Sequence, residues 1–174
     1  MRSVKKRALK AMKKRTTPSY RGLCPASAYA SAAARGTSRK RDTRCERMLR
    51  RALWAAGIRY RIDDASLPGR PDIVLRGARI VIFCDGDFWH GRHLKRRLSQ
   101  LRRGHNSRYW MAKIRRNVER DRVYSKELVA LGWTVVRYWE TDILKDCDRI
   151  AADIRRHAMG RASTMAPEKA LPLP

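Results

Sequence analysis

The chain has 174 residues, the length of one domain with one hydrophobic core. Lysine and arginine number 42 against 16 aspartates and glutamates, which gives a formal net charge of +26 and an isoelectric point near 11.3. Such a chain repels itself unless an anion neutralises it, so nucleic acid is the first partner to consider and a membrane surface the second. The sequence shows no apolar run of roughly 18 residues, as a membrane span needs, and no secretory signal or lipidation motif.

The cysteine spacing indicates the redox state of the compartment and limits the kinds of site that cysteines could form. They are scattered along the chain with no C-x-x-C pair, at Cys24, Cys45, Cys84 and Cys147. This spacing favours a reducing compartment and argues against both a disulfide framework and a cysteine-rich zinc site.

The composition predicts three segments. Residues 1–41 hold 13 lysines or arginines and no acid, so this basic arm is expected to be mostly disordered, with one short helix over 26–35 as an alternative. The arm is either a solvated tail or a segment that lies along phosphates and adds salt-sensitive affinity. Residues 42–158 are the predicted folded domain, and residues 159–174 a disordered C-terminal tail.

A helix is the first predicted element of the domain, over residues 42–57. Thr43 and Glu46 form a capping box at its start, apolar residues recur at helical spacing, and Gly57 stops it. Capping alone explains Glu46, and a catalytic role is the alternative.

Three strands are predicted next. Residues 58–62 alternate as a strand, and two short apolar runs at 73–75 and 78–84 predict a β-hairpin with buried strands. The basic segment 91–105 that follows is predicted to be a surface loop.

A long helix is predicted from a cap at Asn106 or Ser107 to about residue 131. Asp121 interrupts its apolar stripe, and a carboxylate on such a stripe is costly unless a partner hydrogen-bonds it. The rest of the stripe is Met111, Ile114, Val118, Ser125, Leu128 and Leu131.

The last predicted elements are a strand at 133–139 and a helix that Asp146 caps and that ends near His157. The order is therefore helix, three strands, long helix, strand and helix. This order predicts an α/β sandwich, with a central mixed sheet of about four strands between helices.

Two acids mark one edge of the predicted hairpin. Asp72 opens its first strand and Asp85 closes its second, so both should lie near each other. Phosphodiester hydrolysis needs an activated water, a neutralised phosphate and a stabilised leaving oxygen, and Mg²⁺ held by carboxylates supplies all three. We therefore predict Asp72 and Asp85 as Mg²⁺ ligands. The alternative is that both are turn residues, in Pro-Asp and Asp-Gly pairs.

His90 is the candidate general base, because a neutral imidazole accepts a proton near pH 7. If the long helix packs on the hairpin, Asp121 can accept a hydrogen bond from this imidazole. That pairing would fix the tautomer of His90 and satisfy the buried carboxylate.

Two aromatic pairs flank this region, Phe88 with Trp89 and Tyr109 with Trp110. Aromatics at a chain reversal either plug the core or, in a strongly basic protein, wedge between bases. Both interpretations stay open on the residues alone.

Five ordered motifs resemble those of the very-short-patch repair endonucleases, bacterial DNA mismatch nickases with a fold similar to type II restriction enzymes. The motifs are Arg-Asp-Thr at 41–43 with Glu46, Leu-Pro-Gly-Arg-Pro-Asp-Ile-Val at 67–74, Asp-Gly-Asp-Phe-Trp-His-Gly at 85–91, Tyr-Trp-x-x-Lys-Ile-x-x-Asn-x-Glu-Arg-Asp at 109–121 and Leu-Gly-Trp-x-Val-x-x-x-Trp-Glu at 131–140. The match covers two thirds of the chain. It implies a restriction-endonuclease-like three-layer α/β/α sandwich.

The resemblance also implies roles for several of the matching residues. Asp72 would bridge two Mg²⁺ ions, aided by the backbone carbonyl of Cys84. His90 would be the base with Asp121 as its partner, and Glu46 would act through water on the metal. The residues expected to intercalate are Phe88, Trp89 and Trp110, and those expected to contact phosphates are Arg70, Arg92 and Lys113.

The chain departs from the family at a structural zinc site that members commonly hold with Cys and His. The matching positions are Asp87, Arg92, Leu94 and Thr141. None of these makes a convincing zinc site, so Mg²⁺ is the one expected cofactor. The position of Asp85 is often His in members with the zinc, so we expect a rearranged metal shell with Asp85 as a direct ligand.

Residues and resemblance together predict a Mg²⁺-dependent DNA endonuclease that nicks 5′ of the mismatched thymine left when 5-methylcytosine deaminates. The alternatives are a restriction-like or general endonuclease of the same fold and a non-catalytic basic DNA-binding protein. The expected partner is T:G-mismatched duplex DNA, with mismatch-repair proteins as further candidates. The expected form is a monomer near the nucleoid of a bacterial cytoplasm.

Overall fold

The computed structural model describes residue 18 and residues 21–25 and 41–164, except for the side chains of 161–164. Most of the predicted arm, with its alternative helix at 26–35, and residues 165–174 lie outside this description. No helix in the described part is long and apolar enough to cross a membrane.

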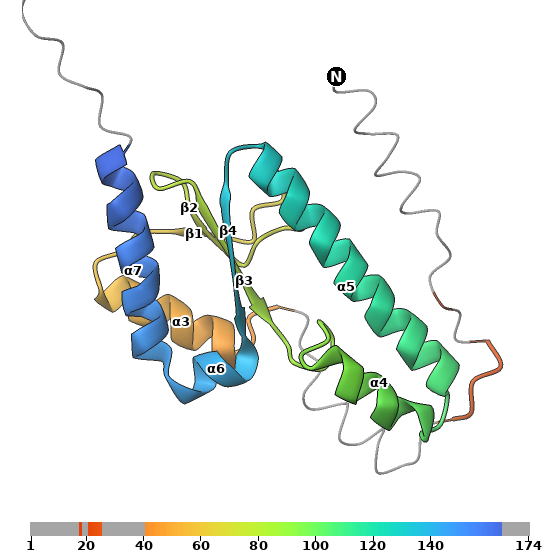
Figure 1. Cartoon of the computed structure of the whole chain (residues 1–174). Coiled ribbons are helices and arrows are strands. Elements are labelled where there is room, and N and C mark those ends of the chain that lie inside the picture. Colours follow the sequence, from red (N-terminus) through yellow and green to blue (C-terminus); the bar gives the residue numbers. More distant parts are fainter. Residues whose placement is uncertain (1–17, 19–20, 26–40, 165–174) are drawn as a thin grey trace, which may run out of the picture.

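A mixed sheet forms the centre of the described domain (Figure 1). Its four strands lie in the order β1 (Arg61–Ile62), β2 (Ile73–Leu75), β3 (Ile80–Asp85) and β4 (Thr134–Trp139). β1 pairs antiparallel with β2 and β2 with β3, whereas β3 and β4 are parallel. The hairpin prediction is confirmed, but β1 is shorter than the predicted strand at 58–62.

Helices cover both faces of the sheet, as the three-layer prediction requires (Figure 1). The helix α5 (Ser107–Ala130) connects β3 to β4 through the parallel crossover and lies on one face. On the other face pack α3 (Arg44–Ala55), α6 (Glu140–Lys145) and α7 (Cys147–Thr164). The architecture is therefore a three-layer α/β/α sandwich.

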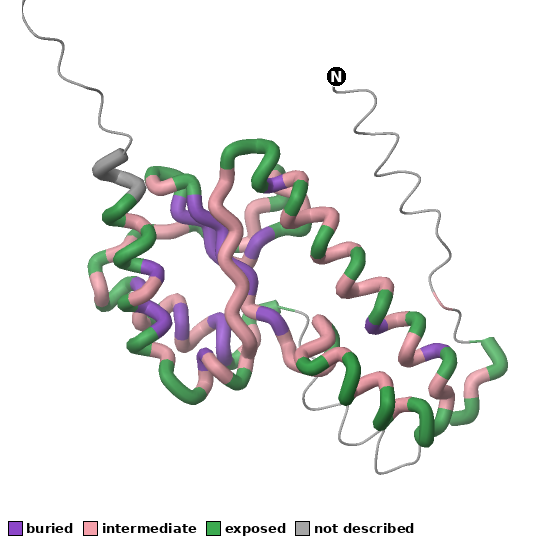
Figure 2. The backbone as a smooth tube through the Cα atoms, viewed as in Figure 1, coloured by how far each residue is buried: buried purple, intermediate pink, exposed green. Residues whose placement is uncertain are grey.

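The side chains of β2 and β3 divide between two cores, because successive residues of a strand point to opposite faces. Val74, Val81 and Phe83 pack with Leu128 of α5. The alternate positions pack with α3, α6 and α7, and include Ile73, Leu75, Ile80 and Ile82 with Leu49, Leu53, Ile143, Ile150 and Ile154. Figure 2 shows this burial concentrated along β2 and β3. A continuous apolar strand is thus explained by burial on both faces.

Two helices differ from the sequence prediction. The predicted loop at 91–105 contains α4 (Leu94–Arg102), which packs against α5. Its half-buried leucines recur at helical spacing, at Leu94, Leu98 and Leu101, among exposed basic residues. The six-residue α6 was not predicted, because it is too short to show a periodic pattern.

The helix ends also correct three details. Asn106 precedes α5 but makes no side-chain cap; its amide instead exchanges two 3.0 Å hydrogen bonds with the backbone of Cys24. Leu131 follows the end of α5 and is exposed, so it does not extend the apolar stripe. Asp146 does cap α7, accepting a 3.1 Å hydrogen bond from the N–H of Arg149, but the helix runs to Thr164 rather than ending near His157.

Candidate active site

Asp72 and Asp85 lie at the same end of the β2–β3 hairpin. Asp72 directly precedes β2 and Asp85 is the last residue of β3, and antiparallel pairing of Ile73 with Ile82 aligns these two strand ends. Asp72 Oδ2 accepts a 2.7 Å hydrogen bond from the backbone N–H of Cys84. The predicted proximity of the two acids is therefore confirmed.

The carboxyl of Asp72 is held in an unfavourable electrostatic setting. Burial, together with the charges of Glu46 and Asp85, raises its pKa to about 7, against the opposing hydrogen bond from Cys84 and the charge of His90. A carboxylate that is costly to ionise on its own gains from a nearby cation. The setting therefore favours a neighbouring cation, such as a divalent metal ion.

Glu46 is occupied by helix capping. Its Oε1 accepts a 2.7 Å hydrogen bond from Thr43 Oγ1, and its Oε2 accepts one of 2.9 Å from the N–H of Asp42. The predicted capping box is confirmed. Glu46 is also 9 % exposed and close enough to Asp72 to raise its pKa, so it adds negative charge to the site.

Asp85 is bound by an arginine that the sequence analysis did not single out. Arg137 on β4 donates from Nε and from one terminal nitrogen to the two oxygens of Asp85, at 2.6 and 2.7 Å. The guanidinium lies 4.5 Å from the centre of the Phe83 ring, and the same terminal nitrogen is 3.6 Å from Asp121 Oδ2. Asp85 is 4 % exposed, so this is a buried, bidentate ion pair.

His90 is held between two carboxylates. Its Nδ1 lies 2.6 Å from Asp121 Oδ2 and 3.4 Å from Asp85 Oδ1. The predicted packing of Asp121 onto the imidazole is therefore confirmed. With the proton on Nδ1 donated to Asp121, Nε2 is left as the acceptor.

The pKa of Asp121 is lowered. Burial works against this, but the hydrogen bond to His90 and the charges of His90, Arg137 and Arg120 outweigh it. Asp121 is thus ionised at neutral pH, as an acceptor for the imidazole N–H must be.

The predicted wedge residues form one cluster. The ring centres of Phe88, Trp89 and Trp110 lie 5.0 to 6.0 Å apart, and Trp89 is 41 % exposed. Lys113 Nζ lies 5.4 Å from Trp89 and 5.6 Å from Trp110, which places a positive charge over the cluster. Phe88 and Trp89 directly precede His90 in the loop after β3, whereas Trp110 lies on α5.

The predicted phosphate-contacting residues have different surroundings. Arg70 is exposed and pairs with Asp63 at 2.8 Å, and Lys113 accompanies the aromatic cluster. Arg92 is instead occupied by Asp87 at 3.0 Å and Asp142 at 2.8 Å, and it also donates to Thr141. This arrangement argues against Arg92 as a phosphate contact.

Three of the four positions matched to zinc ligands make up this same ionic network. Thr141 donates to Asp87 from its hydroxyl, at 2.9 Å, and from its N–H, at 3.2 Å, while Arg92 bridges them. The fourth, Leu94, begins α4. The network joins the loop after β3 to the start of α6.

The oxygen atoms near Asp72 suit Mg²⁺, which needs few protein ligands, better than they suit a metal ion held by three or more side chains. In the described part, no three His, Cys, Asp or Glu side chains are grouped so that they could hold an ion together. Mg²⁺ typically keeps several waters and takes one or two carboxylates plus substrate phosphate. The Asp72 carboxylate with the neighbouring Cys84 carbonyl matches that pattern, whereas both oxygens of Asp85 are engaged by Arg137.

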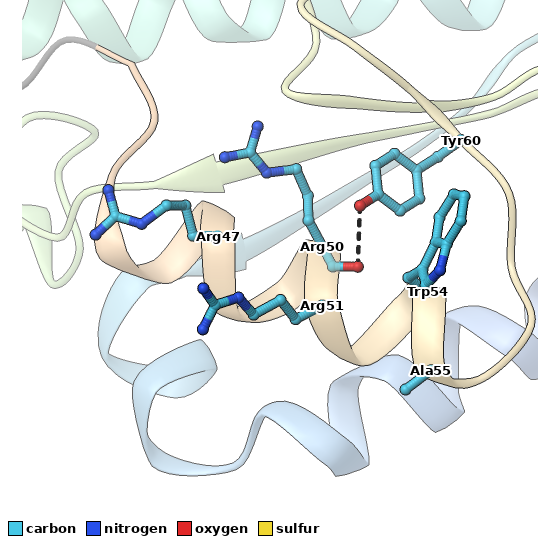
Figure 3. Close-up of a pocket in the computed structure, with 6 residues that line it drawn as sticks. All are labelled: Arg47, Arg50, Arg51, Trp54, Ala55 and Tyr60. Carbon is cyan, nitrogen blue, oxygen red and sulfur yellow. Dashed lines mark hydrogen bonds between the residues drawn. The ribbon is translucent and has the colours of Figure 1, made fainter.

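A separate hollow of about 390 Å³ lies along α3, outside this site (Figure 3). It is lined by Arg47, Arg50, Arg51, Trp54, Ala55 and Tyr60. Tyr60 closes one side, where its hydroxyl donates a 3.0 Å hydrogen bond to the carbonyl of Arg50. No candidate catalytic residue lines the hollow.

A three-layer α/β/α sandwich with acids at the strand ends of a hairpin, and a His–Asp pair beside them, defines a nuclease of the restriction-endonuclease-like class. Comparison with known proteins agrees: the family model described as "DNA mismatch endonuclease Vsr" matches residues 31–96. The chain belongs to this Vsr family, that of the very-short-patch repair endonucleases, and is a DNA endonuclease, a phosphodiester hydrolase.

Three relatives illustrate the match. A type II nicking enzyme of Neisseria meningitidis serogroup C is 33% identical over 142 residues, which cover 82% of this chain and 88% of the relative. A type II nicking enzyme of Haemophilus parainfluenzae is 34% identical over 122 residues, 70% of this chain and 85% of the relative. The DNA mismatch endonuclease Vsr of Escherichia coli (strain K12) is 44% identical over 100 residues, 58% of this chain and 62% of the relative.

Proposed function

We propose that this endonuclease nicks one strand of duplex DNA at T:G mismatches, 5′ of the mismatched thymine, in a Mg²⁺-dependent hydrolysis. Membership of the Vsr family supports DNA as the substrate and a mismatched base pair as the feature that the enzyme recognises. The observation that most strongly supports the chemistry is the 2.6 Å contact of His90 with Asp121, next to the half-buried Asp72, whose pKa is raised.

In this proposal the side chains act in a general-base hydrolysis. Nε2 of His90 accepts a proton from water as the water oxygen bonds to phosphorus and the bond to the leaving oxygen breaks. Asp121 stabilises the imidazolium that forms, as a carboxylate on the far nitrogen does in other His–Asp pairs. Asp72 and the Cys84 carbonyl would hold Mg²⁺, which when bound neutralises phosphate charge and favours ionisation of water.

Mismatch recognition is proposed for the cluster of Phe88, Trp89 and Trp110. A wedge between base steps costs a few kcal/mol of unstacking, and this cost is lower at a mismatch than in a paired duplex. The exposed ring of Trp89 and the charge of Lys113 suit that role. Arg70, just before β2, is the proposed phosphate contact.

The alternative of the same fold is an endonuclease that cuts matched duplexes equally well. Labelled duplexes that differ only in one T:G, T:A or C:G pair distinguish the two, with Mg²⁺ or with EDTA. We expect one nick, on the thymine strand, in the T:G duplex with Mg²⁺ alone. Equal cleavage of all three duplexes would reject mismatch specificity, and equal rates in EDTA would reject Mg²⁺ dependence.

A catalytically impaired variant and a matched control complete this assay. Asp72→Asn should still bind duplex DNA and should lose nicking. Asp148→Asn removes the same charge from an exposed position in the first turn of α7, remote from the site, and should nick like the parent. Undiminished nicking by Asp72→Asn would contradict the proposed role of Asp72.

A further inference from the structure

The guanidinium of Arg137 is a positive charge at the centre of the candidate site. Arg137 reaches Asp85 with two hydrogen bonds of 2.6 and 2.7 Å, and one of the same nitrogens is 3.6 Å from Asp121. Its other terminal nitrogen donates to Ser125 Oγ at 3.4 Å, and the Phe83 ring lies beneath it. The guanidinium is therefore fixed by contacts from β3, α5 and the strand that carries it.

Both oxygens of Asp85 accept a hydrogen bond in this pair, and Oδ1 also lies 3.4 Å from His90 Nδ1. A planar guanidinium matches a carboxylate with two parallel hydrogen bonds, a geometry that a lysine cannot reproduce. Asp85 is almost completely buried, so releasing it to a metal ion would leave the half-buried Arg137 with only the 3.6 Å contact to Asp121 to offset its charge. Asp85, the predicted second carboxylate ligand, is therefore held away from a metal ion while the pair is intact.

The charges point the same way. The site contains four acids, Asp72, Asp85, Asp121 and the neighbouring Glu46, and two arginines contact them, Arg137 at Asp85 and Arg120 at Asp121. Two negative charges remain, which one divalent cation balances. A second divalent cation would add an excess of positive charge next to a fixed guanidinium, which is unfavourable at low dielectric.

We propose that Arg137 is a positioning residue that withholds Asp85 from metal, so that the site binds one divalent ion, at Asp72, instead of two. Arg137 also keeps Asp85 and Asp121 together on the Nδ1 side of His90. This inference deepens the proposed function and rests on it, because it concerns how the same site binds its metal.

The test is a titration of the full-length protein, without DNA, with Mn²⁺ above pH 7, with free Mn²⁺ followed by electron paramagnetic resonance. We expect one ion per chain in the parent and none in Asp72→Asn. Asp85→Asn should keep one ion, bound more weakly because Arg137 then lacks its partner. Loss of binding in Asp85→Asn, or any number other than one in the parent, would overturn the proposal.

Removal of the arginine gives the converse result. Arg137→Met should bind a second ion or bind the first about tenfold more tightly, since Asp85 is then released, and Asp85→Asn in that background should reverse the gain. Arg120→Met is the matched control: Arg120 contacts Asp121 at 3.2 Å without touching Asp85, so one ion should still bind. Unchanged Mn²⁺ binding in a folded Arg137→Met protein would reject the proposal; if that variant does not fold, the comparison of Asp72→Asn with Asp85→Asn decides.

Failure of this inference is distinguishable from failure of the proposed function. Binding of one Mn²⁺ ion by a protein that does not nick T:G duplexes would reject the function and keep the metal stoichiometry. Efficient nicking by a protein that binds two ions would do the reverse.

Discussion

His90 and Asp121 are joined by a 2.6 Å contact that connects the loop after β3 to the middle of α5. The contact satisfies a carboxylate on the inner side of a helix and orients an imidazole with one bond. Because the two residues are 31 positions apart, the packing of α5 against the sheet determines whether the pair forms. Folding and chemistry are thus coupled at this contact.

Asp121→Asn should therefore slow nicking strongly. An asparagine keeps the shape but cannot stabilise an imidazolium or enforce one tautomer, so we expect a loss of about 10²- to 10⁴-fold in the single-turnover rate. Affinity for duplex DNA should change little. Glu119→Gln, the same charge change at an exposed position of α5, is the control and should retain the parental rate. A full rate in Asp121→Asn would remove His90 from the role of an oriented base.

The raised pKa of Asp72 predicts how the free energy of unfolding depends on pH. Its pKa in the folded, metal-free protein is raised to about 7, whereas an unfolded chain ionises it near 3.8. The folded state therefore holds the extra proton between these values, so stability from this group is complete below about pH 4 and is lost as pH rises through 7, with a slope of at most about 1.4 kcal/mol per pH unit.

Asp72→Asn should flatten that part of the curve of unfolding free energy against pH. At pH 8 the variant should be more stable than the metal-free parent, by about 1 to 2 kcal/mol once partial exposure is allowed for. Mg²⁺ at pH 8 should raise the unfolding midpoint of the parent and not that of Asp72→Asn. An equal response of both proteins to Mg²⁺ would show that the ion binds elsewhere.

The sequence was sufficient for features that depend on local pattern. The capping box of Thr43 and Glu46 and the hairpin of β2 and β3 follow from residue spacing. The pairing of Asp121 with His90 was predictable because a lone acid on an apolar stripe demands a partner, and a histidine lay at the end of the neighbouring hairpin. These predictions needed no knowledge of distant strand order.

Arg137 could not be found in the same way. Its role depends on the parallel pairing of β3 with β4, in which Arg137 lies opposite Phe83 and so on the same face as Asp85. Sequence pattern predicts that a strand exists but not its neighbour or its register. The helix α4 was missed for a different reason: its three leucines carry the correct spacing, but the surrounding basic residues suggested a loop.

The network of Asp87, Arg92, Thr141 and Asp142 predicts that this fold holds without a structural metal. Three of these residues stand at positions matched to zinc ligands, and their hydrogen bonds already join the loop after β3 to α6. Dialysis against EDTA should therefore leave the thermal unfolding midpoint of the purified protein, measured without Mg²⁺, unchanged. A lowered midpoint that Zn²⁺ restores and Mg²⁺ does not would contradict this.

Arg92→Met tests the network itself. The change should lower the unfolding midpoint and speed amide hydrogen exchange in residues 86–93, since the loop loses its bridge to α6. Arg96→Met, an exposed position on α4, is the matched control and should leave both unchanged. Identical exchange in the two variants would mean that the loop is held by its aromatic packing alone.

Among the aromatic cluster, we expect the loss of Trp89 to weaken binding to mismatched DNA the most. It is 41 % exposed while in ring contact with Phe88 and Trp110, so it can reach a base without leaving its neighbours. Trp89→Ala should weaken binding to a T:G duplex by about 10- to 100-fold, the stacking contribution of one base, and binding to a matched duplex much less.

The matched control is Trp54→Ala. Trp54 is also exposed, at 57 %, but it lies in the hollow along α3 with Arg59 stacked at 3.8 Å. Any effect of its loss should be the same for matched and mismatched duplexes, because that surface offers charge and a ring without a neighbouring catalytic residue. The ratio of the two affinities, measured by fluorescence anisotropy, is therefore the deciding quantity. A ratio that Trp89→Ala leaves unchanged would place mismatch discrimination outside the aromatic cluster.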